Sequence, residues 1–153
     1  MIAGILRESG TEKRVAMLPA EAAGLKKLGL DVIVEHDAGM NSFTPDDEYV
    51  KAGVAACSRK DVLERSSLLL SVNTLPEEDL KLCREGQVLC SVVSPVENRA
   101  WLEKANSKKL TVLALDLIPR TTRAQSMDIL SSMATVAGYK AVLHAASLLP
   151  RCF

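Results

Sequence analysis

Short apolar runs alternate with helix-like segments along most of the chain, and this alternation constrains the fold more than any other feature. The runs at residues 2–6, 32–34, 54–57, 68–72, 88–93 and 110–115 are predicted to be strands. Strands separated by helices of this length need crossover connections, which are right-handed and place the strands parallel. Both faces of such a sheet are covered by helices, so its strands are apolar throughout rather than alternating.

Helices are predicted between these runs, at residues 19–28, 45–52, 59–65, 77–84, 96–105 and 127–149. Pro19 suits a first helical turn and Gly29 suits the end of that helix. Thr44 is the expected N-cap of the second helix, and Ser58 that of the third. The predicted fold class is α/β, flavodoxin-like in outline, with a largely parallel sheet, helices on both faces and a long C-terminal helix. We expect an α/β domain over residues 1–126, followed by a helical segment over residues 127–153.

Composition limits the classes of function. The 153 residues suffice for one domain with a real core, and 48% are hydrophobic and 25% charged, which are ordinary globular values. The formal net charge is zero, so nothing indicates a nucleic-acid partner. The four cysteines have no metal-ligand spacing and are expected to be free thiols, as in a reducing cytosol. We predict no metal site.

The segment 119–139 joins the last predicted strand to the longest predicted helix and is dense in polar side chains. Asp128, Ser131, Thr135 and Tyr139 stand at i, i+3, i+7 and i+11, and so lie on one side of a helix. The other positions are mostly apolar, and we expect this helix to be packed on most of its circumference. A polar line on a packed helix needs partners, either protein groups or a ligand. An ordinary capped helix with a solvated face explains the pattern equally well.

This segment also carries a family resemblance. The matching pieces are Pro119-Arg120, residues 123–132 (RAQSMDILSS) and residues 137–142 (AGYKAV). They resemble the signature of the NAD(P) transhydrogenase alpha subunits, within the wider alanine dehydrogenase and transhydrogenase family. The resemblance extends over nearly the whole chain.

The resemblance implies a function. The complete enzyme would hold the nicotinamide end of NAD(H) while a hydride passes to NADP on a partner subunit, coupled to proton translocation. Arg120 would act on the nicotinamide as a positioning and electrostatic group. Gln125 and Asp128 would fix its carboxamide and ring by hydrogen bonds, and Ser131 would donate or accept a hydrogen bond beside them. Tyr139 would hydrogen-bond near the site. The implied assembly is a homodimer with an NAD-binding domain and membrane and NADP-binding subunits, cytoplasmic and peripheral to the inner membrane.

Three departures qualify this expectation. The eight glycines stand at 4, 10, 24, 29, 39, 53, 86 and 138, so no GxG occurs and a self-sufficient Rossmann-type dinucleotide site is absent from the sequence. In the resembled family a separate NAD-binding domain follows the long helix. We therefore expect a truncated chain or one piece of a split subunit, inactive alone. Alanine dehydrogenases have a substrate-binding lysine and a histidine, but here the lysine position falls at Asn73 and the histidine position falls near Val92. Neither can bind a carboxylate as a cation or shuttle a proton.

Two alternatives remain open. The first is an amino-acid dehydrogenase domain of the same family, which Asn73 and Val92 argue against. The second is a non-catalytic module for dimerisation or partner binding, which the absent nucleotide domain favours and the dense polar loop at residues 120–128 argues against. Arg14, on the loop after the first strand, is a candidate cation for the ligand-binding edge of the sheet. A surface arginine paired with a nearby acid is an equally good reading of Arg14.

Overall fold

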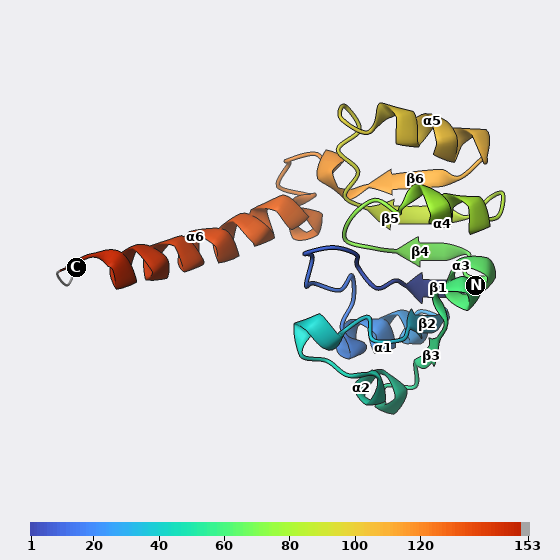
Figure 1. Ribbon diagram of the computed structural model, residues 1–153, viewed down its shortest axis with the longest axis horizontal. Helices are drawn as coiled ribbons and strands as arrows, with labels where there is room; N and C mark the ends of the chain where they lie inside the picture. The colour runs from blue at the N-terminus through green and yellow to red at the C-terminus, as the bar shows by residue number, and fades with distance from the viewer. Residues whose placement is uncertain (151–153) are drawn as a thin grey trace. The chain divides into compact units, whose positions relative to one another are not determined.

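The computed structural model describes residues 1–150 (Figure 1). By the contacts between its residues the chain divides into two units, Met1–Ala114 and Leu115–Phe153. We call the first the sheet unit and the second the helical unit. The boundary predicted from sequence, after residue 126, stays a prediction about domains.

The sheet unit is built on six parallel strands. They are β1 (Ile2–Ile5), β2 (Asp31–Glu35), β3 (Ala55–Cys57), β4 (Leu68–Leu70), β5 (Val88–Ser91) and β6 (Thr111–Ala114). Their order is β3-β2-β1-β4-β5-β6, and every neighbouring pair is parallel. The predicted α/β class and parallel sheet are confirmed. The sequence-based outline left the strand order open, and the observed order reverses direction between β1 and β4.

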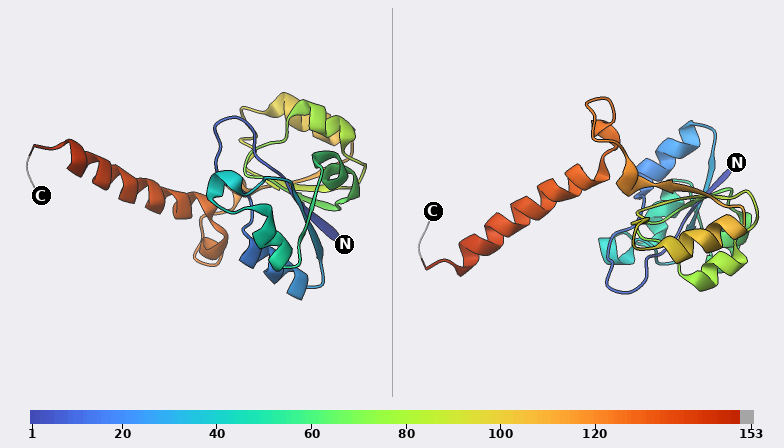
Figure 2. Two further views of the ribbon diagram at one scale, coloured as in Figure 1. Left: turned by 60° about the horizontal axis from the view of Figure 1, so that its bottom comes forward. Right: turned by 90° about the horizontal axis from the view of Figure 1, so that it is seen from above.

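Helices cover both faces of this sheet, as predicted (Figure 2). The helices are α1 (Pro19–Lys27), α2 (Asp46–Lys51), α3 (Arg59–Arg65), α4 (Glu77–Leu82) and α5 (Arg99–Ser107). One core cluster joins α1 and α2 to one face through Ala22 and Tyr49, which pack with Ile5 and Val34. The other cluster joins α3, α4 and α5 to the opposite face; its helix residues include Val62, Leu80 and Trp101. The face of the sheet that the helices cover therefore changes between α2 and α3.

Two large aromatic residues, Tyr49 and Trp101, are buried in the core, and their polar atoms have partners. The Trp101 indole N–H donates to the carbonyl of Leu75 at 2.7 Å, and the Tyr49 hydroxyl donates to the carbonyl of Met17 at the same distance. Burial raises the pKa of Tyr49 to about 12. A buried polar group without a partner costs about 1–3 kcal/mol, so these bonds are what allow the two side chains to be buried.

The predicted elements are found, and the differences lie at their ends: β4, β5 and α4, for example, each end two residues earlier than predicted. Ser58 caps α3 as expected, since its hydroxyl accepts from the Asp61 amide at 3.1 Å. The cap of α2 is Pro45 rather than Thr44. The helix α5 begins at Arg99 rather than at residue 96, because residues 94–97 form turns in which Ser94 has a φ of 48°.

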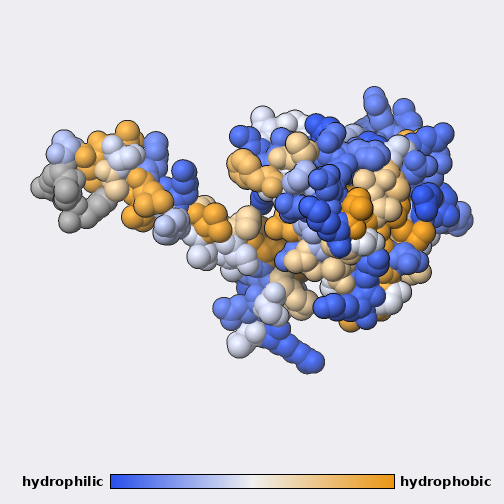
Figure 3. Space-filling model, turned by 90° about the horizontal axis from the view of Figure 1, so that it is seen from below, coloured by the Kyte–Doolittle hydropathy of each residue, from blue (hydrophilic) through white to orange (hydrophobic). Residues whose placement is uncertain are grey.

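The helical unit contains two short 3₁₀ turns, Leu115–Leu117 and Gln125–Met127, and the long helix α6 (Ile129–Leu148). The predicted long C-terminal helix is confirmed, although it starts two residues later than expected. Apolar side chains lie along α6 (Figure 3), yet none of its residues is buried. The close packing expected around this helix is therefore not found within residues 1–150. A helix that is apolar on all sides is normally covered by other protein. No helix in this part of the chain is both long enough and apolar enough to cross a bilayer.

Gly4 in β1 provides a test of the packing between the sheet and α3. A Cβ at this position would overlap the Ser66 hydroxyl and come within 2.7 Å of Val62 Cγ1. We expect Gly4→Ala to lower the free energy of unfolding by about 1–3 kcal/mol through overpacking. Chemical denaturation measures this change.

Gly24 in α1 is the matched control, because nothing lies within 4 Å of an added Cβ there. Gly24→Ala should raise stability by up to about 1 kcal/mol through helix propensity. The Ser66 hydroxyl is buried without a hydrogen-bond partner among the described residues, so Ser66→Ala should also be tolerated and should rescue part of the loss in Gly4→Ala. Equal effects of Gly4→Ala and Gly24→Ala would show that the close approach at Gly4 is unimportant.

Candidate functional site

The loop before α6 carries most of the predicted site residues and is a succession of tight turns. The Thr121 amide donates to Pro119 at 2.9 Å, the Ala124 amide to Thr121 at 3.0 Å and the Met127 amide to Ala124 at 2.9 Å. Ala124 is buried, while the side chains of the neighbouring polar residues are exposed. A loop held by its own backbone bonds can present side chains in fixed positions before any ligand arrives.

Asp128 is buried and caps α6. Its carboxylate accepts from the amides of Leu130 and Ser131 at 3.0 and 3.2 Å, and from the Ser131 hydroxyl at 2.6 Å. The hydrogen bond from the Ser131 hydroxyl is the main reason that the pKa of Asp128 lies below its usual value, and the charge of Arg120 acts in the same direction. The helix-cap reading of the polar stripe therefore accounts for Asp128 and Ser131.

The cap does not account for the other predicted residues. The side chains of Arg120 and Gln125 are exposed and form no hydrogen bond with any other described residue. Tyr139 lies almost three turns along α6 and is 70% exposed. Thr135, the fourth member of the stripe, donates its hydroxyl to the Ser131 carbonyl at 3.1 Å. The structure thus bonds Ser131 to Asp128 and brings the charge of Arg120 close enough to act on that carboxylate. Gln125 and Tyr139 have no such contacts among the described residues.

In the sheet unit, the order of the strands identifies where a ligand would be expected. The chain leaves β1 toward α1 on one face and leaves β4 toward α4 on the other, and crevices of this kind are the usual ligand sites of doubly wound sheets. Glu8, just after β1, joins the segment that follows β1 to the segment that follows β4. Its carboxylate accepts from the Val72 amide at 2.5 Å and from the Asn73 amide and side chain at 3.2 and 3.3 Å.

Arg14 lies on the same loop as Glu8 and is paired within the chain. Its guanidinium donates to both carboxylate oxygens of Glu12, at 2.9 and 2.6 Å. These bonds lower the pKa of Glu12 to about 2. Of the two readings of Arg14, the pairing with a nearby acid is the one observed. The Asn73 side chain donates to Glu8, and Val92 directly follows β5. Because an amide and an aliphatic side chain carry no charge and do not titrate, neither position supplies a cation or a proton carrier.

A junction that sequence analysis missed lies at the same edge of the sheet. The half-buried guanidinium of Arg59 donates to Glu35 at 2.6 Å, to Asp79 at 2.5 Å and to the Arg7 carbonyl at 3.0 Å. Burial lowers the pKa of Arg59, but the bonds to Asp79 and the charge of Glu35 outweigh it and raise that pKa overall. The only sequence signal was a charged residue directly after the Ser58 cap, which is too common to identify a three-way junction.

Other features carry no candidate chemistry. No group of His, Cys, Asp and Glu within residues 1–150 could hold a metal ion. Cys57, Cys83 and Cys90 are free thiols, and burial raises the pKa of Cys83 to about 11, which keeps it unreactive. Cys152 lies outside the described residues.

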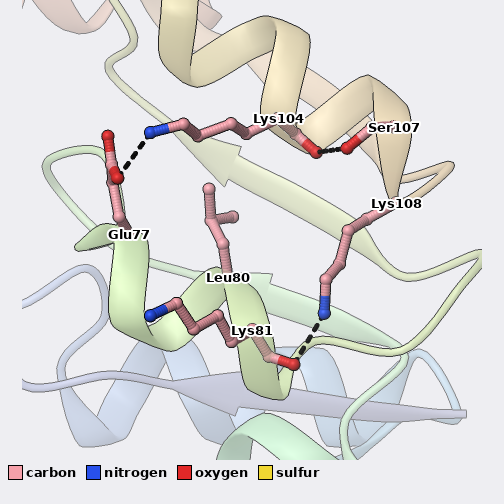
Figure 4. A pocket seen from close by; sticks show the side chains of 6 residues that line it. All are labelled: Glu77, Leu80, Lys81, Lys104, Ser107 and Lys108. Atoms are coloured by element: carbon pink, nitrogen blue, oxygen red, sulfur yellow. Dashed lines mark hydrogen bonds and ion pairs between the residues drawn. The ribbon is translucent and has the colours of Figure 1, made fainter.

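A hollow of about 270 Å³ lies between α4 and α5 (Figure 4). Lysines line it, but Lys104 pairs with Glu77 at 2.5 Å and Lys108 donates to the Lys81 carbonyl at 2.6 Å. Its charged groups are thus largely satisfied by the chain itself.

Comparison with known proteins agrees with the fold and the loop. Residues 4–137 match the family model described as "Alanine dehydrogenase/PNT, N-terminal domain". The NAD(P) transhydrogenase subunit alpha of Haemophilus influenzae is 39% identical over 95% of this chain and 28% of that protein. The crystal structure of transhydrogenase from Sinorhizobium meliloti superposes with a TM-score of 0.93 at 39% identity, covering 99% of this chain and 44% of that one. An L-alanine dehydrogenase structure gives 0.87 at 26% identity, covering 96% and 40%.

A doubly wound parallel sheet followed by this loop and helix defines the class as the N-terminal domain shared by alanine dehydrogenases and transhydrogenases. The chain belongs to that family. Both relatives named as transhydrogenases are more similar to it than the alanine dehydrogenase structure is. The chain spans less than half the length of each of these proteins.

The bond between Ser131 and Asp128 can be tested by titration. We expect Ser131→Ala to raise the pKa of Asp128 toward its ordinary value, because the largest favourable contact of the carboxylate is removed. Carboxyl-carbon NMR of Asp128 across the acidic range measures this. Since the folded pKa is lowered, the cap stabilises α6 fully above the ordinary aspartate pKa, and its contribution is lost as pH falls through the folded value.

Ser132→Ala is the matched control for this titration. The Ser132 hydroxyl donates at 3.2 Å to the backbone carbonyl of Asp128 rather than to its carboxylate. The control should leave the titration of Asp128 nearly unchanged. An equal shift in both variants would mean that general helix fraying, rather than the hydroxyl bond, sets this pKa.

Proposed function

We propose that this chain is the first part of a transhydrogenase alpha subunit and that its 120–128 loop positions the nicotinamide of NAD(H). The observation that supports this most directly is the loop itself: a series of hydrogen-bonded turns in which Arg120 and Gln125 are exposed, followed by Asp128, the N-cap of α6. When bound, the nicotinamide supplies the hydride. The chain supplies a fixed set of hydrogen-bonding groups around it.

The residues fit a carboxamide ligand by their chemistry. The amide of Gln125 offers two donors and one acceptor, and has no hydrogen bond of its own among residues 1–150. Arg120 is a fixed positive charge near Asp128. Asp128 and Ser131 hold the start of α6 in place, and one carboxylate oxygen already serves two amides. In this proposal Gln125 and Arg120 contact the ring and its carboxamide, whereas Asp128 and Ser131 set the geometry.

Hydride transfer between two nicotinamides requires no general acid or base, which suits this chain. Neither Asn73 nor Val92 can replace the lysine and histidine of an alanine-oxidising site. The similarity to a solved alanine dehydrogenase extends to the fold, but the transhydrogenases match at higher identity. An amino-acid dehydrogenase therefore remains the weaker of the two enzymatic alternatives.

The remaining parts of the activity would come from protein beyond this chain. We propose that an NAD-binding domain holds the rest of NAD(H), that NADP sits on a partner subunit, and that membrane subunits couple the reaction to proton translocation. The complete assembly would be a homodimer at the cytoplasmic side of the inner membrane. The apolar surface of α6 is the part of the chain suited to pack against such protein.

A non-catalytic role in partner binding or dimerisation is the second candidate. The exposed apolar residues of α6, among them Val136, Val142 and Leu148, favour it. It leaves the exposed Arg120 and Gln125 without a purpose. The kinetic experiment below separates the two candidates.

In the complete enzyme, we expect Gln125→Ala to slow hydride transfer far more than it weakens NAD(H) binding. Loss of one neutral hydrogen bond changes affinity by only about 0.5–1.5 kcal/mol. A misplacement of about 1 Å at the reacting carbons can reduce the rate on the order of a hundredfold. Arg120→Ala and Asp128→Asn should act similarly, with a larger binding loss for Arg120 because a charge is removed. Single-turnover kinetics and equilibrium titration on the same variants measure the two effects.

Arg99→Ala is the control for the charge removed at Arg120. Arg99 is exposed on α5 and forms an ordinary surface pair with Glu103 at 3.1 Å. It should leave both rate and affinity unchanged. Hydride-transfer rates that are normal in all three loop variants would make the loop structural and would favour the partner-binding role.

A further expectation concerns the 153-residue chain alone. It should bind NADH weakly or not at all, because the sequence has no GxG turn and no helix N-terminus prepared for a pyrophosphate. Isothermal titration calorimetry with NADH tests this. A dissociation constant in the micromolar range, lost on substitution of Arg120, would contradict the expectation and would indicate a phosphate site in this chain.

A further inference from the structure

We propose that the loop at residues 39–44 is a docking surface, and that its Phe43 enters an apolar pocket of another subunit, rimmed by lysine or arginine side chains. The inference rests on the proposed function, because the partner is another subunit of the transhydrogenase assembly. It concerns binding between subunits and assigns no part to the 120–128 loop or to the crevice between β1 and β4.

Phe43 is the starting observation. It has the highest exposed fraction of the large apolar residues within 1–150, 96%, and Met40, three positions earlier, is 51% exposed. Neither residue belongs to a core cluster of the sheet unit. Single apolar residues on a surface are common and need no explanation by themselves. The conformation of the loop is what distinguishes Phe43 from them.

The backbone of Phe43 lies in the left-handed region, with a φ of 59°, at the end of a 3₁₀ turn. Bulky residues rarely adopt this conformation, whereas glycine adopts it without strain. The Phe43 amide donates to the Met40 carbonyl at 3.1 Å. The amides of Ser42 and Thr44 donate to the Gly39 carbonyl at 2.9 and 3.0 Å. The turn thus holds an aromatic side chain outward in a strained conformation, and strain of this kind clusters at functional sites.

The base of the loop is fixed as well. A Cβ added at Gly39 would lie 2.5 Å from the Thr44 carbonyl oxygen and 3.0 Å from the ring of the buried Tyr49. At the start of the loop, the Asp37 amide donates to the Asp46 carboxylate at 2.9 Å. The loop is therefore ordered before a partner arrives, which lowers the entropy that binding must overcome.

Charge identifies the kind of partner. Residues 37–48 contain four carboxylates and no lysine or arginine. Asp46 pairs with His36, while Asp37, Asp47 and Glu48 are exposed and form no ion pair within residues 1–150. Complementary interfaces place potentials of opposite sign against each other, so the fitting surface is basic. An aromatic anchor in a desolvated pocket with charges at its rim is the usual arrangement of a binding hot spot.

The same charges disfavour a second copy of this chain as the occupant. In a twofold-symmetric dimer each patch meets the same patch of the other copy. Two acidic loops would then face each other, and like charges across an interface oppose association.

The experiment is titration of the complete alpha subunit with the membrane and NADP-binding subunits of the assembly, followed by biolayer interferometry. Phe43→Gly should weaken binding about tenfold or more, as expected for the loss of an aromatic anchor. In the 153-residue chain the same substitution should raise the melting temperature by about 2–4 °C, because glycine removes the backbone strain. A residue that serves only the fold would instead lower it.

Lys109→Gly is the matched control for strain. Lys109 also has a positive φ, 53°, and its side chain forms a surface pair with Glu85 at 2.6 Å. Its substitution should raise the melting temperature similarly and leave the affinity unchanged. For charge, Asp47→Asn should weaken binding at low salt and reduce its salt dependence. Glu78→Gln, an exposed acid in the first turn of α4, should do neither.

Equal affinities for wild type and Phe43→Gly would overturn the proposal, and so would a lower melting temperature in Phe43→Gly. Self-association of the 153-residue chain that Phe43→Gly abolishes, measured by sedimentation, would assign the surface to a second copy and would overturn it too. Hydride-transfer rates that stay normal in Gln125→Ala contradict the nicotinamide role and leave these affinities unaffected. The two proposals therefore fail separately.

Discussion

A parallel sheet must cover both of its faces, and this requirement shapes the rest of the sheet unit. The chain meets it by sending α1 and α2 to one face and α3, α4 and α5 to the other. The change of face opens the edge between β1 and β4, where backbone amides lose their strand partners. Glu8 supplies the missing acceptors across this edge. Next to it, Arg59 joins the end of β2, the Arg7 carbonyl and α4 in one half-buried junction. At the carboxyl edge of the sheet, hydrogen bonds from charged side chains thus join several elements to one another.

Local signals in the sequence were sufficient to predict the strands and helices but not the contacts of Glu8 and Arg59. Apolar runs located all six strands, and Ser58 located the start of α3, because these depend on neighbouring residues. The start of α5 was placed too early because the turn at Ser94, where φ is positive, has no glycine to reveal it. The Glu8 and Arg59 contacts join residues 64 and 20 positions apart. Only the strand order brings such residues together, and the pattern of apolar runs did not determine that order.

The loop before α6 shows how one pattern can support two readings at once. The stripe of Asp128, Ser131 and Thr135 is explained by hydrogen bonds within the helix and its cap. A cap of this kind also fixes the position of everything just before it. Arg120 and Gln125 therefore project from a backbone that the cap and the turns hold still. The structural reading of Asp128 does not compete with the proposed functional reading of Gln125; it is a condition for it.

The two units differ in how their polar groups are satisfied, and the difference bears on chemistry. At the edge of the sheet unit, hydrogen bonds to other groups of the chain are made by Glu8, Glu12, Arg14 and Arg59. In the helical unit, Arg120 and Gln125 keep their hydrogen-bonding groups exposed. A reaction between two nicotinamides needs placement and does not need a bound carboxylate substrate or a proton carrier. An exposed positioning loop suits that requirement, whereas the oxidation of an amino acid would also require a proton carrier, which neither Asn73 nor Val92 can supply.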